Sequence, residues 1–317
     1  MGNYCFGVDV GGTTVKCGLF RTDGTLLEKW EIPTRVEDEG KNIIGDIGAA
    51  LLEKMEEKQL NREDLVGIGM GVPGPVDQNG VVPGAVNLHW GRKDLPAELG
   101  GLTGLPVWAG NDANVAALGE MWKGGGAGTK NLILATLGTG VGGGIIVNGH
   151  IVTGSHGAGG EIGHCRVNRQ EEEACNCGNK GCLEQYASAT GIARLARRNL
   201  ESSGDASVLR DMDPEKITAK DVFDACKAGD SLAVQVIDQF AGYLGNALAV
   251  FATVVDPEVI VLGGGVSKAG DLLIEVVKKV FREDAFYVSK EIPIVLAKLG
   301  NDAGIYGAAK LAIDGNS

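Results

Sequence analysis

The stretch DVGGTTVKCGLF, residues 9–20, has the pattern of a strand that ends near a carboxylate, a glycine and threonine turn, and a second strand. The stretch ATLGTGVGGGIIVN, residues 135–148, repeats this order in the middle of the chain. Glycine has no Cβ, so the backbone N–H groups of such turns can approach a ligand closely. The two copies together predict two related halves that offer backbone donors to a shared polyphosphate. Either copy alone would be typical of a plain β-turn.

Three glycine clusters contain the candidate phosphate-binding residues. Backbone N–H groups and threonine hydroxyls would donate to phosphate oxygens in the first two clusters, whereas the third follows an apolar strand and would lie against a nucleoside or its phosphates. Lys16 either supplies positive charge or faces solvent. The candidates are Gly11, Gly12, Thr13, Thr14, Lys16, Gly138, Thr139, Gly140, Gly263, Gly264 and Gly265.

Residues 138–143, GTGVGG, also match the GxGxxG dinucleotide fingerprint, with Glu161 at about the expected 20 residues downstream. That fingerprint requires a helix to begin at the glycines. Residues 144–152, GIIVNGHIV, instead predict a β-hairpin with an Asn-Gly turn. No GxxxxGK[ST] motif is present either. The pattern therefore favours a hairpin-type phosphate site over a dinucleotide or Walker-type site.

Two acidic residues at the ends of predicted strands are candidates for metal binding and for proton abstraction. Asp9 would hold Mg²⁺, directly or through water, to screen the charge of a nucleotide; it could equally cap its own turn. Asp112 follows the strand PVWAG, residues 106–110, and is the candidate general base. Asn111 or Asp112 could instead only cap the helix that follows. A helix N-terminus weakens a carboxylate as a base, but phosphoryl transfer takes the acceptor's proton late.

A metal site is predicted between residues 161 and 184, which read EIGHCRVNRQEEEACNCGNKGCLE. One histidine and three cysteines form a closed Cys3His set, which is typical of a structural Zn²⁺ rather than a catalytic one. The predicted ligands are His164, Cys175, Cys177 and Cys182. The metal would fix Glu161 and Glu184, one outside each end of the set. The alternative is a group of free thiols near a histidine, and Cys165 is expected to be a bystander.

Composition excludes several classes of protein. The 317 residues exceed the usual size of one domain, which predicts two. With 29 basic and 41 acidic residues the net charge is −12, and no basic cluster indicates a nucleic-acid partner. The first ten residues predict a strand rather than a signal peptide, and no apolar run approaches the roughly 20 residues of a membrane span. Seven cysteines, three of them within eight positions, fit a reducing compartment, so we expect a cytoplasmic protein.

Alternating strand and helix patterns predict sheets covered by helices, that is, an α/β fold. The predicted helices cover residues 42–58, 112–122, 190–201, 231–255, 270–282 and 305–313, with a capped helix that starts at Thr218, and the predicted strands include 65–72, 131–137 and 258–264. Residues 73–106 contain five prolines and little periodicity. We expect this segment to be a long loop outside the core that covers or lines a cleft.

Seven motifs together resemble the ROK family of sugar kinases and repressors, and within it most closely the bacterial ATP-dependent glucokinases. They are DVGGTTVKCGLF, GVPGPVD, NDANVAALGE, LGTGVGGGIIVNG, GAGGEIGH, CNCGNKGCLEQYAS and VIVLGGGVS, in this order across nearly the whole chain. The resemblance implies a two-domain α/β fold of the ribonuclease-H-like, actin-like ATPase type with a cleft between the domains. We expect a small domain of residues 1–115 plus about 302–317, a larger domain of 116–301 that carries the zinc loop, and a homodimer or homotetramer.

The resemblance also assigns roles by matching motif. Asp112 would take the proton of the 6-hydroxyl of glucose, while ATP with Mg²⁺ supplies the γ-phosphoryl group. The other sugar contacts would be Gly74, Asn111, Glu161, His164 and Glu184, and His164 would both bind zinc and contact the sugar. The alternatives are a kinase for mannose, fructose or an N-acetylhexosamine, or a non-catalytic sugar-responsive regulator. Repressor members carry a DNA-binding helix-turn-helix before the first glycine turn, and only eight residues precede Asp9 in this sequence.

Overall fold

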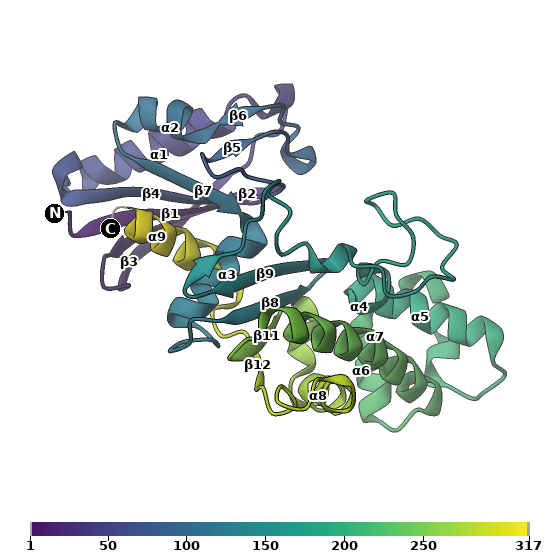
Figure 1. The fold of residues 1–317 in the computed structure, drawn as a ribbon. Coiled ribbons are helices and arrows are strands. Elements are labelled where there is room, and N and C mark those ends of the chain that lie inside the picture. The colour runs from purple at the N-terminus through teal and green to yellow at the C-terminus, as the bar shows by residue number, and fades with distance from the viewer. Residues whose placement is uncertain (1, 316–317) are drawn as a thin grey trace. The chain divides into compact units, whose positions relative to one another are not determined.

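The computed structural model describes residues 2–315 (Figure 1). The chain divides into two compact units, Met1–Lys130 with Gly144–Gly160 and Lys298–Ser317, and Asn131–Gly143 with Glu161–Ala297. Residues 116–130 and 144–160, which we expected in the larger domain, thus belong to the first unit. The reason is that helix α3 (Asp112–Lys123) runs across the expected boundary at residue 115 and packs along α9 (Ala303–Gly315).

The first unit is built on a five-stranded mixed sheet. Its strands, in the order β3-β2-β1-β4-β7, are β3 (Leu26–Pro33), β2 (Thr14–Arg21), β1 (Tyr4–Val10), β4 (Leu65–Val72) and β7 (Val107–Asn111). β1 pairs antiparallel with β2 and parallel with β4, and β4 pairs parallel with β7. The carboxyl ends of β1, β4 and β7 therefore lie at one edge of the sheet, and the first glycine turn joins β1 to β2 at that edge.

Both faces of this sheet are buried, because β1 alternates its side chains between two cores. Phe6, Val8 and Val10 pack in the core that includes α1 (Ile43–Glu57) and α2 (Leu95–Thr103), whereas Cys5 packs against α9. Figure 1 shows α1 and α2 on the side of the sheet opposite α9. β4, which reads LVGIGMGV, is buried at all eight positions. Its Gly69 lets α9 approach closely, since a Cβ there would overlap the carbonyl oxygen of Ala308.

The expectation of a loop outside the core over residues 73–106 was wrong. This segment forms β5 (Val81–Val82), β6 (Lys93–Asp94) and α2, and it buries Val76, Val82, Leu88, Trp90, Leu95 and Leu99. Proline and glycine interrupt the periodicity of the segment, so its apolar residues give no clear local pattern. They are buried because the segment packs with α1 on the sheet, which only tertiary contacts can specify.

The second sheet has the order β10-β9-β8-β11-β12, and the division between the units falls within β9. Its strands are β8 (Leu132–Leu137), β9 (Val141–Val147), β10 (His150–Ile151), β11 (Val259–Gly263) and β12 (Ile294–Leu296). β11 pairs parallel with both β8 and β12. The predicted hairpin after the second glycine turn is confirmed, since β9 and β10 are antiparallel and Asn148 and Gly149 have φ of 53° and 83°.

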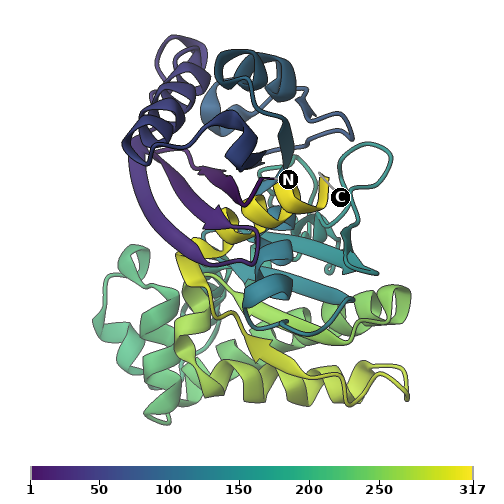
Figure 2. The ribbon, with the colours of Figure 1, turned by 90° about the vertical axis from the view of Figure 1, so that its left-hand side faces the viewer.

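The rest of the second unit is mainly helical, as predicted. Its helices are α4 (Glu184–Ala187), α5 (Ala189–Ser202), α6 (Ala219–Lys227), α7 (Ser231–Val255) and α8 (Asp271–Asp284). The predicted start at Thr218 is confirmed by a reciprocal capping box with Asp221. α7 is the central helix and packs against α5, α6 and α8, and Figure 2 shows these green helices from a second side.

Short 3-10 helices connect these elements. They are η1 (Asp38–Gly40), η2 (Arg62–Asp64), η3 (Val86–Leu88), η4 (Ile162–His164), η5 (Val208–Asp211), η6 (Pro214–Lys216), η7 (Gly265–Ala269) and η8 (Gly300–Asp302). Across residues 2–315, no helix has both the length and the apolar content needed to cross a membrane.

Candidate active site

In the first unit, the strand ends bring Asn111, Asp112 and Gly74 together. Asn111 caps α3, because its Oδ1 accepts hydrogen bonds from the N–H groups of Ala113 (3.0 Å) and Asn114 (3.1 Å). Its Nδ2 donates to the carbonyl of Gly74 at 3.1 Å. The N–H of Ala113 also donates to Oδ1 of Asp112 at 2.8 Å. The capping role that the sequence left open thus falls to Asn111, which also holds the Gly74 turn beside Asp112.

Asp9 lies at the same edge of the sheet, on β1. Its burial raises its pKa from 3.8 to about 6, the positive charge of Lys16 lowers it, and the negative charge of Asp112 raises it. The influence of Asp112 means that the two carboxylates share one polar region, as their strands predict. Gly304, at the start of α9, borders the Asp9 carboxylate, and a Cβ at this position would overlap it.

The first glycine turn is closed by its own backbone and by Thr34. The N–H of Gly11 donates to the carbonyl of Thr14 at 3.0 Å, and the hydroxyl of Thr34 donates to the carbonyl of Gly11 at 2.7 Å. Gly12 and Thr13, at the tip, are exposed. The ammonium group of Lys16 donates to the carbonyl of Asn301 at 3.0 Å. Lys16 therefore connects β2 to the segment that leads into α9, a role that neither alternative from the sequence included.

In the second unit, the turn at residues 138–140 is held by the start of α5 and by Glu184. The carbonyls of Gly138 and Thr139 accept hydrogen bonds from the N–H of Ala189 (2.8 Å) and the hydroxyl of Thr190 (2.6 Å). The N–H of Val141 donates to Oε2 of Glu184 at 3.0 Å. A Cβ on Gly140 would overlap this carboxylate. Glu184 thus positions the glycine turn, in addition to the sugar contact expected of it.

The third glycine cluster lies beside the second. Gly263 ends β11, and Gly264 has a φ of 79°. A Cβ on Gly264 would come 2.6 Å from the backbone of Leu137, the residue that precedes the 138–140 turn. Both clusters therefore border one region at the carboxyl ends of β8 and β11 within the second unit.

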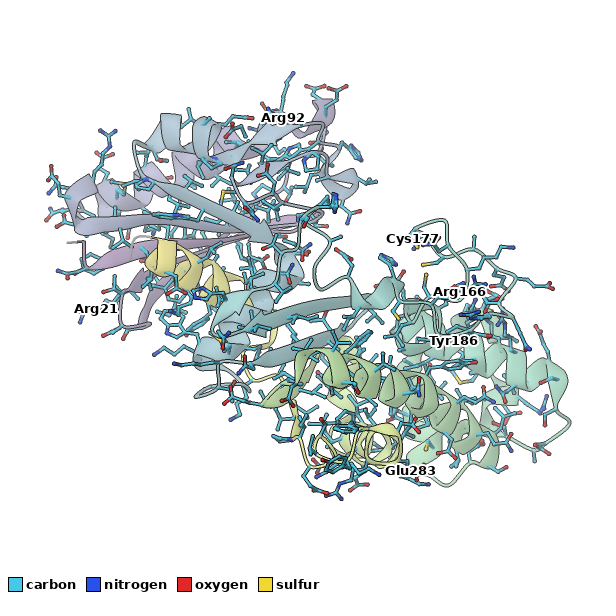
Figure 3. The ribbon with its side chains drawn as sticks, viewed as in Figure 1. Arg21, Arg92, Arg166, Cys177, Tyr186 and Glu283 are labelled. Carbon is cyan, nitrogen blue, oxygen red and sulfur yellow. The ribbon has the colours of Figure 1, made fainter. Side chains whose placement is uncertain are left out.

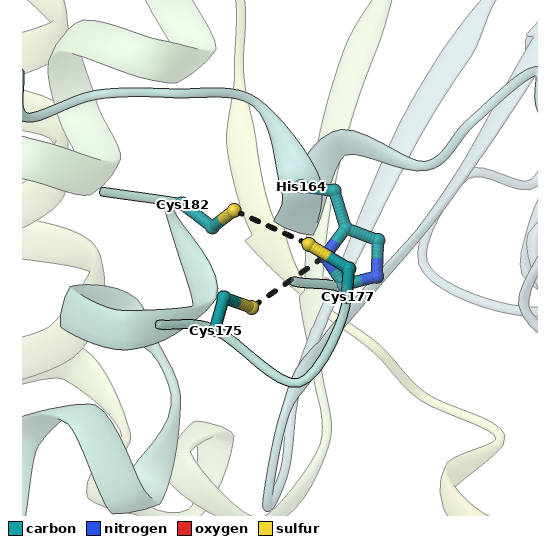
Figure 4. Close-up of side chains that lie close together, drawn as sticks. All are labelled: His164, Cys175, Cys177 and Cys182. Atoms are coloured by element: carbon teal, nitrogen blue, oxygen red, sulfur yellow. Dashed lines mark hydrogen bonds between the residues drawn. The ribbon is translucent and has the colours of Figure 1, made fainter. Parts of the chain in front are cut away.

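The four predicted metal ligands converge in the second unit (Figure 4). Their donor atoms lie within 4.8 Å of one another; the Sγ atoms of Cys177 and Cys182 are 3.6 Å apart, and Sγ of Cys175 lies 3.9 Å from Nδ1 of His164. A tetrahedral zinc with bonds of about 2.3 Å to sulfur requires sulfur atoms about 3.8 Å apart. The four residues therefore fit this metal. Cys165, the expected bystander, is outside the cluster.

His164 faces the cysteines with one ring nitrogen and a carboxylate with the other. Nδ1 points toward Cys175, whereas Nε2 lies 4.0 Å from Oε2 of Glu161. Glu184, two residues beyond the last cysteine, places its Oε1 3.5 Å from Sγ of Cys175. The second unit thus gathers Glu161, His164 and Glu184 around one cluster of thiols.

Sequence reasoning missed the residues that support these turns. Thr34 is 23 positions from Gly11, and Thr190 is 51 positions from Thr139. Thr34 and Thr190 lie in segments without a recognisable motif, and a threonine by itself gives no signal of its partner. The only available indication was that Thr190 begins the helix predicted over residues 190–201.

Two sheets of this topology, each with a glycine turn between neighbouring strands and the first with Asp9 and Asp112 at its strand ends, are those of an α/β protein of the ribonuclease-H-like, actin-like ATPase class. The model of the ROK family matches residues 5–315. The chain therefore belongs to the ROK family.

Individual relatives extend this result. The glucokinase of Halalkalibacterium halodurans is 47% identical over 308 residues, which cover 96% of this chain and 93% of the relative. A ROK family glucokinase from Streptomyces griseus, solved in complex with glucose and AMPPNP, is 34% identical with a TM-score of 0.76, over 98% of this chain and 99% of the other. The ROK hexokinase from Thermus thermophilus is 32% identical with a TM-score of 0.80, over 97% of each chain.

Proposed function

We propose that this protein is an ATP-dependent glucokinase, which transfers the γ-phosphoryl group of ATP to the 6-hydroxyl of glucose and releases glucose 6-phosphate. The observation that carries the proposal is similarity over almost the whole chain to a glucokinase at 47% identity. The similar S. griseus glucokinase binds glucose together with the ATP analogue AMPPNP. The glycine turns and strand-end carboxylates described above are suited to this chemistry.

The first unit would supply the base. Asp112 accepts the proton of the sugar hydroxyl, and the N–H of Ala113 holds one of its carboxylate oxygens at 2.8 Å. A fixed carboxylate orients the hydroxyl, which is the main requirement of phosphoryl transfer through a loose transition state. Asp9 would hold Mg²⁺, which screens the phosphate charge when it is bound. The exposed tip of the first glycine turn, Gly12 and Thr13, would donate to phosphate oxygens.

The second unit would supply sugar contacts and further phosphate donors. The carboxylates of Glu161 and Glu184 would accept hydrogen bonds from sugar hydroxyls that do not react, and His164 would also contact the sugar. Asn111 and Gly74 are the sugar contacts proposed for the first unit. Zinc at the Cys3His cluster would be structural, because four protein ligands leave no position for water. Bound to Nδ1 of His164, it would leave Nε2 directed toward Glu161, which fixes the tautomer of the ring.

Replacing Asp112 by Asn tests the assignment of the base. The amide cannot accept the proton, so kcat should fall by about 10²-fold or more while the affinity for glucose changes little. ATP-dependent acid release with glucose measures turnover, and calorimetric titration with glucose measures binding. Asp205→Asn, at an exposed position in the second unit, is the control and should retain normal turnover. Near-normal kcat in Asp112→Asn would exclude Asp112 as the base.

A sugar panel separates glucose from the alternatives. We expect kcat/KM to be highest for glucose among glucose, mannose, fructose and N-acetylglucosamine, since a site built to pair one set of hydroxyls rejects sugars that leave its polar groups unpaired. A higher kcat/KM for another sugar would identify that sugar as the substrate of the same phosphoryl transfer. Binding of glucose without turnover would instead indicate a sugar-responsive regulator.

A further inference from the structure

Glu171, in the middle of the cysteine-rich loop, is a buried carboxylate that contacts none of the proposed ligands. Its side chain is only 2% exposed. Two arginines and a tyrosine donate hydrogen bonds to it: Arg198 to both oxygens at 3.0 Å, Arg194 at 2.9 Å and the hydroxyl of Tyr186 at 2.5 Å. The N–H groups of Glu172 and Glu173 add two bonds of 3.1 Å. A buried charge would be very costly without such partners, so this part of the loop is held in one conformation.

The network continues to the last cysteine. Arg194 also donates to the carbonyl of Gln185 at 2.9 Å. The side-chain oxygen of Gln185 accepts hydrogen bonds from the backbone N–H groups of Gly181 (2.8 Å) and Cys182 (3.1 Å). The backbone that carries the thiol of Cys182 is therefore connected to Glu171 through two side chains.

The same network reaches the first cysteine from the other side. Glu173, two residues before Cys175, pairs its carboxylate with Arg194 and Arg198 at 2.9 Å each. The amide nitrogen of Gln185 donates to the carbonyl of Glu173 at 3.1 Å. Arg194 and Arg198 are four residues apart on α5 and so lie on one face of that helix. The protein thus holds the chain at both ends of the cysteine cluster.

Aromatic packing anchors the network to the helical core. The ring of Tyr186 is fully buried and stacks on Tyr243 of α7 with centroids 4.0 Å apart, and the guanidinium of Arg194 lies 5.2 Å from the Tyr186 ring. Figure 3 labels Tyr186 on the helical side of the loop and Cys177 toward its outer end. The base of the loop therefore packs against the core of the second unit, whereas residues 172–174 and 176–180 are exposed.

We propose that Glu171 is a positioning residue that pre-organises the Cys3His loop for zinc. The inference rests on the proposed metal site and concerns how this chain builds it. A loop of 19 residues between His164 and Glu184 would lose much conformational entropy if metal binding alone had to order it. The Glu171 network orders the backbone near Cys175 and Cys182 in advance. Zinc affinity should therefore depend on a residue that never touches the metal.

The test measures zinc affinity in folded protein, by competition with a chromogenic zinc chelator at a temperature well below unfolding. Glu171→Gln keeps the shape but removes the charge, and zinc should bind about 10- to 100-fold more weakly. Tyr186→Phe removes the hydroxyl that donates to Glu171 and accepts from Asn168, so it should also weaken zinc binding, and it serves if Glu171→Gln does not fold. Glu291→Gln is the matched control, since its ion pair with Arg282 leaves the glutamate side chain 75% exposed, and it should bind zinc normally.

The outcomes separate the two levels of the proposal. Wild-type protein that retains no zinc would overturn the metal site and this inference together. If the wild type binds zinc and the zinc affinity of Glu171→Gln and Tyr186→Phe is unchanged, the positioning role is overturned and the metal site stands. A lower unfolding midpoint with unchanged zinc affinity would also overturn it, because that is the signature of a residue that only stabilises the fold. The supporting result is a lower zinc affinity in variants that remain folded, with turnover restored by excess zinc.

Discussion

Replacing Asp9 by Asn should stabilise the folded protein near pH 8 while it removes activity. Asp9 is partly buried at the end of β1, and this burial raises its pKa from 3.8 to about 6, with a further contribution from the charge of Asp112 and an opposing one from Lys16. A raised carboxyl pKa means that the folded state disfavours the ionised form. Asparagine has nearly the same shape and no charge, so it removes the free-energy cost of an ionised side chain at this position.

The size and the sign follow from the two pKa values. A carboxyl whose pKa is 3.8 when unfolded and about 6 when folded destabilises the folded state by roughly 3 kcal/mol well above pH 6. Because Asp9 keeps some contact with water, we expect about half of this, roughly 1.5 kcal/mol. As the pH falls through about 6, the folded state binds a proton before the unfolded state does. The advantage of Asp9→Asn should therefore shrink and disappear below about pH 4.

Urea unfolding of the nucleotide-free protein without added Mg²⁺, at about pH 8 and about pH 4.5, gives the free energy of unfolding of each variant. Asp205→Asn, at an exposed position, should show no such gain. Turnover of Asp9→Asn with ATP and glucose should fall by at least about 10²-fold, because a group that organises charge around the phosphates is lost. A variant that is less stable than wild type at pH 8, or equally stabilised at both pH values, would refute the electrostatic reasoning.

The remaining predictions concern packing and buried hydrogen bonds in the first unit. Gly69→Ala should destabilise the protein by about 3 kcal/mol or prevent folding, because its Cβ would overlap the carbonyl of Ala308. Gly45→Ala in α1, with nothing within 4 Å of its Cβ, should instead stabilise the protein by about 0.5–1 kcal/mol. Urea unfolding compares the two variants, and equal effects would contradict the close approach of α9. Glu120→Ala should cost about 3 kcal/mol or more, since this 1% exposed carboxylate accepts hydrogen bonds from the N–H groups of Gly125, Lys298 and Leu299. The exposed Glu53→Ala on α1 is its control, and a loss below about 0.5 kcal/mol in Glu120→Ala would show that water replaces the carboxylate.

Local patterns in the sequence were enough to predict most elements and the clustering of His164, Cys175, Cys177 and Cys182. The Asn-Gly hairpin, the capping box at Thr218 and the long helix α7 follow from preferences of neighbouring residues, which act over a few positions. The Cys3His set was recognisable because zinc ligands recur at characteristic spacings, and the structure brings its four donor groups within 4.8 Å. Membership in the ROK family follows from motifs spread across the chain.

Only the tertiary structure decided which groups support one another. Glu120 accepts a hydrogen bond from the N–H of Leu299, 179 positions away, and Lys16 donates one to the carbonyl of Asn301, 285 positions away. The burial of residues 73–106, the proton affinity of Asp9 and the Glu171 network are of the same kind. Burial and charge interactions depend on distance in space, which residues far apart in the chain acquire only when the sheets and helices pack. Local periodicity carries no record of those distances, so the sequence determined the elements and the reactive residue types, while packing determined their environment.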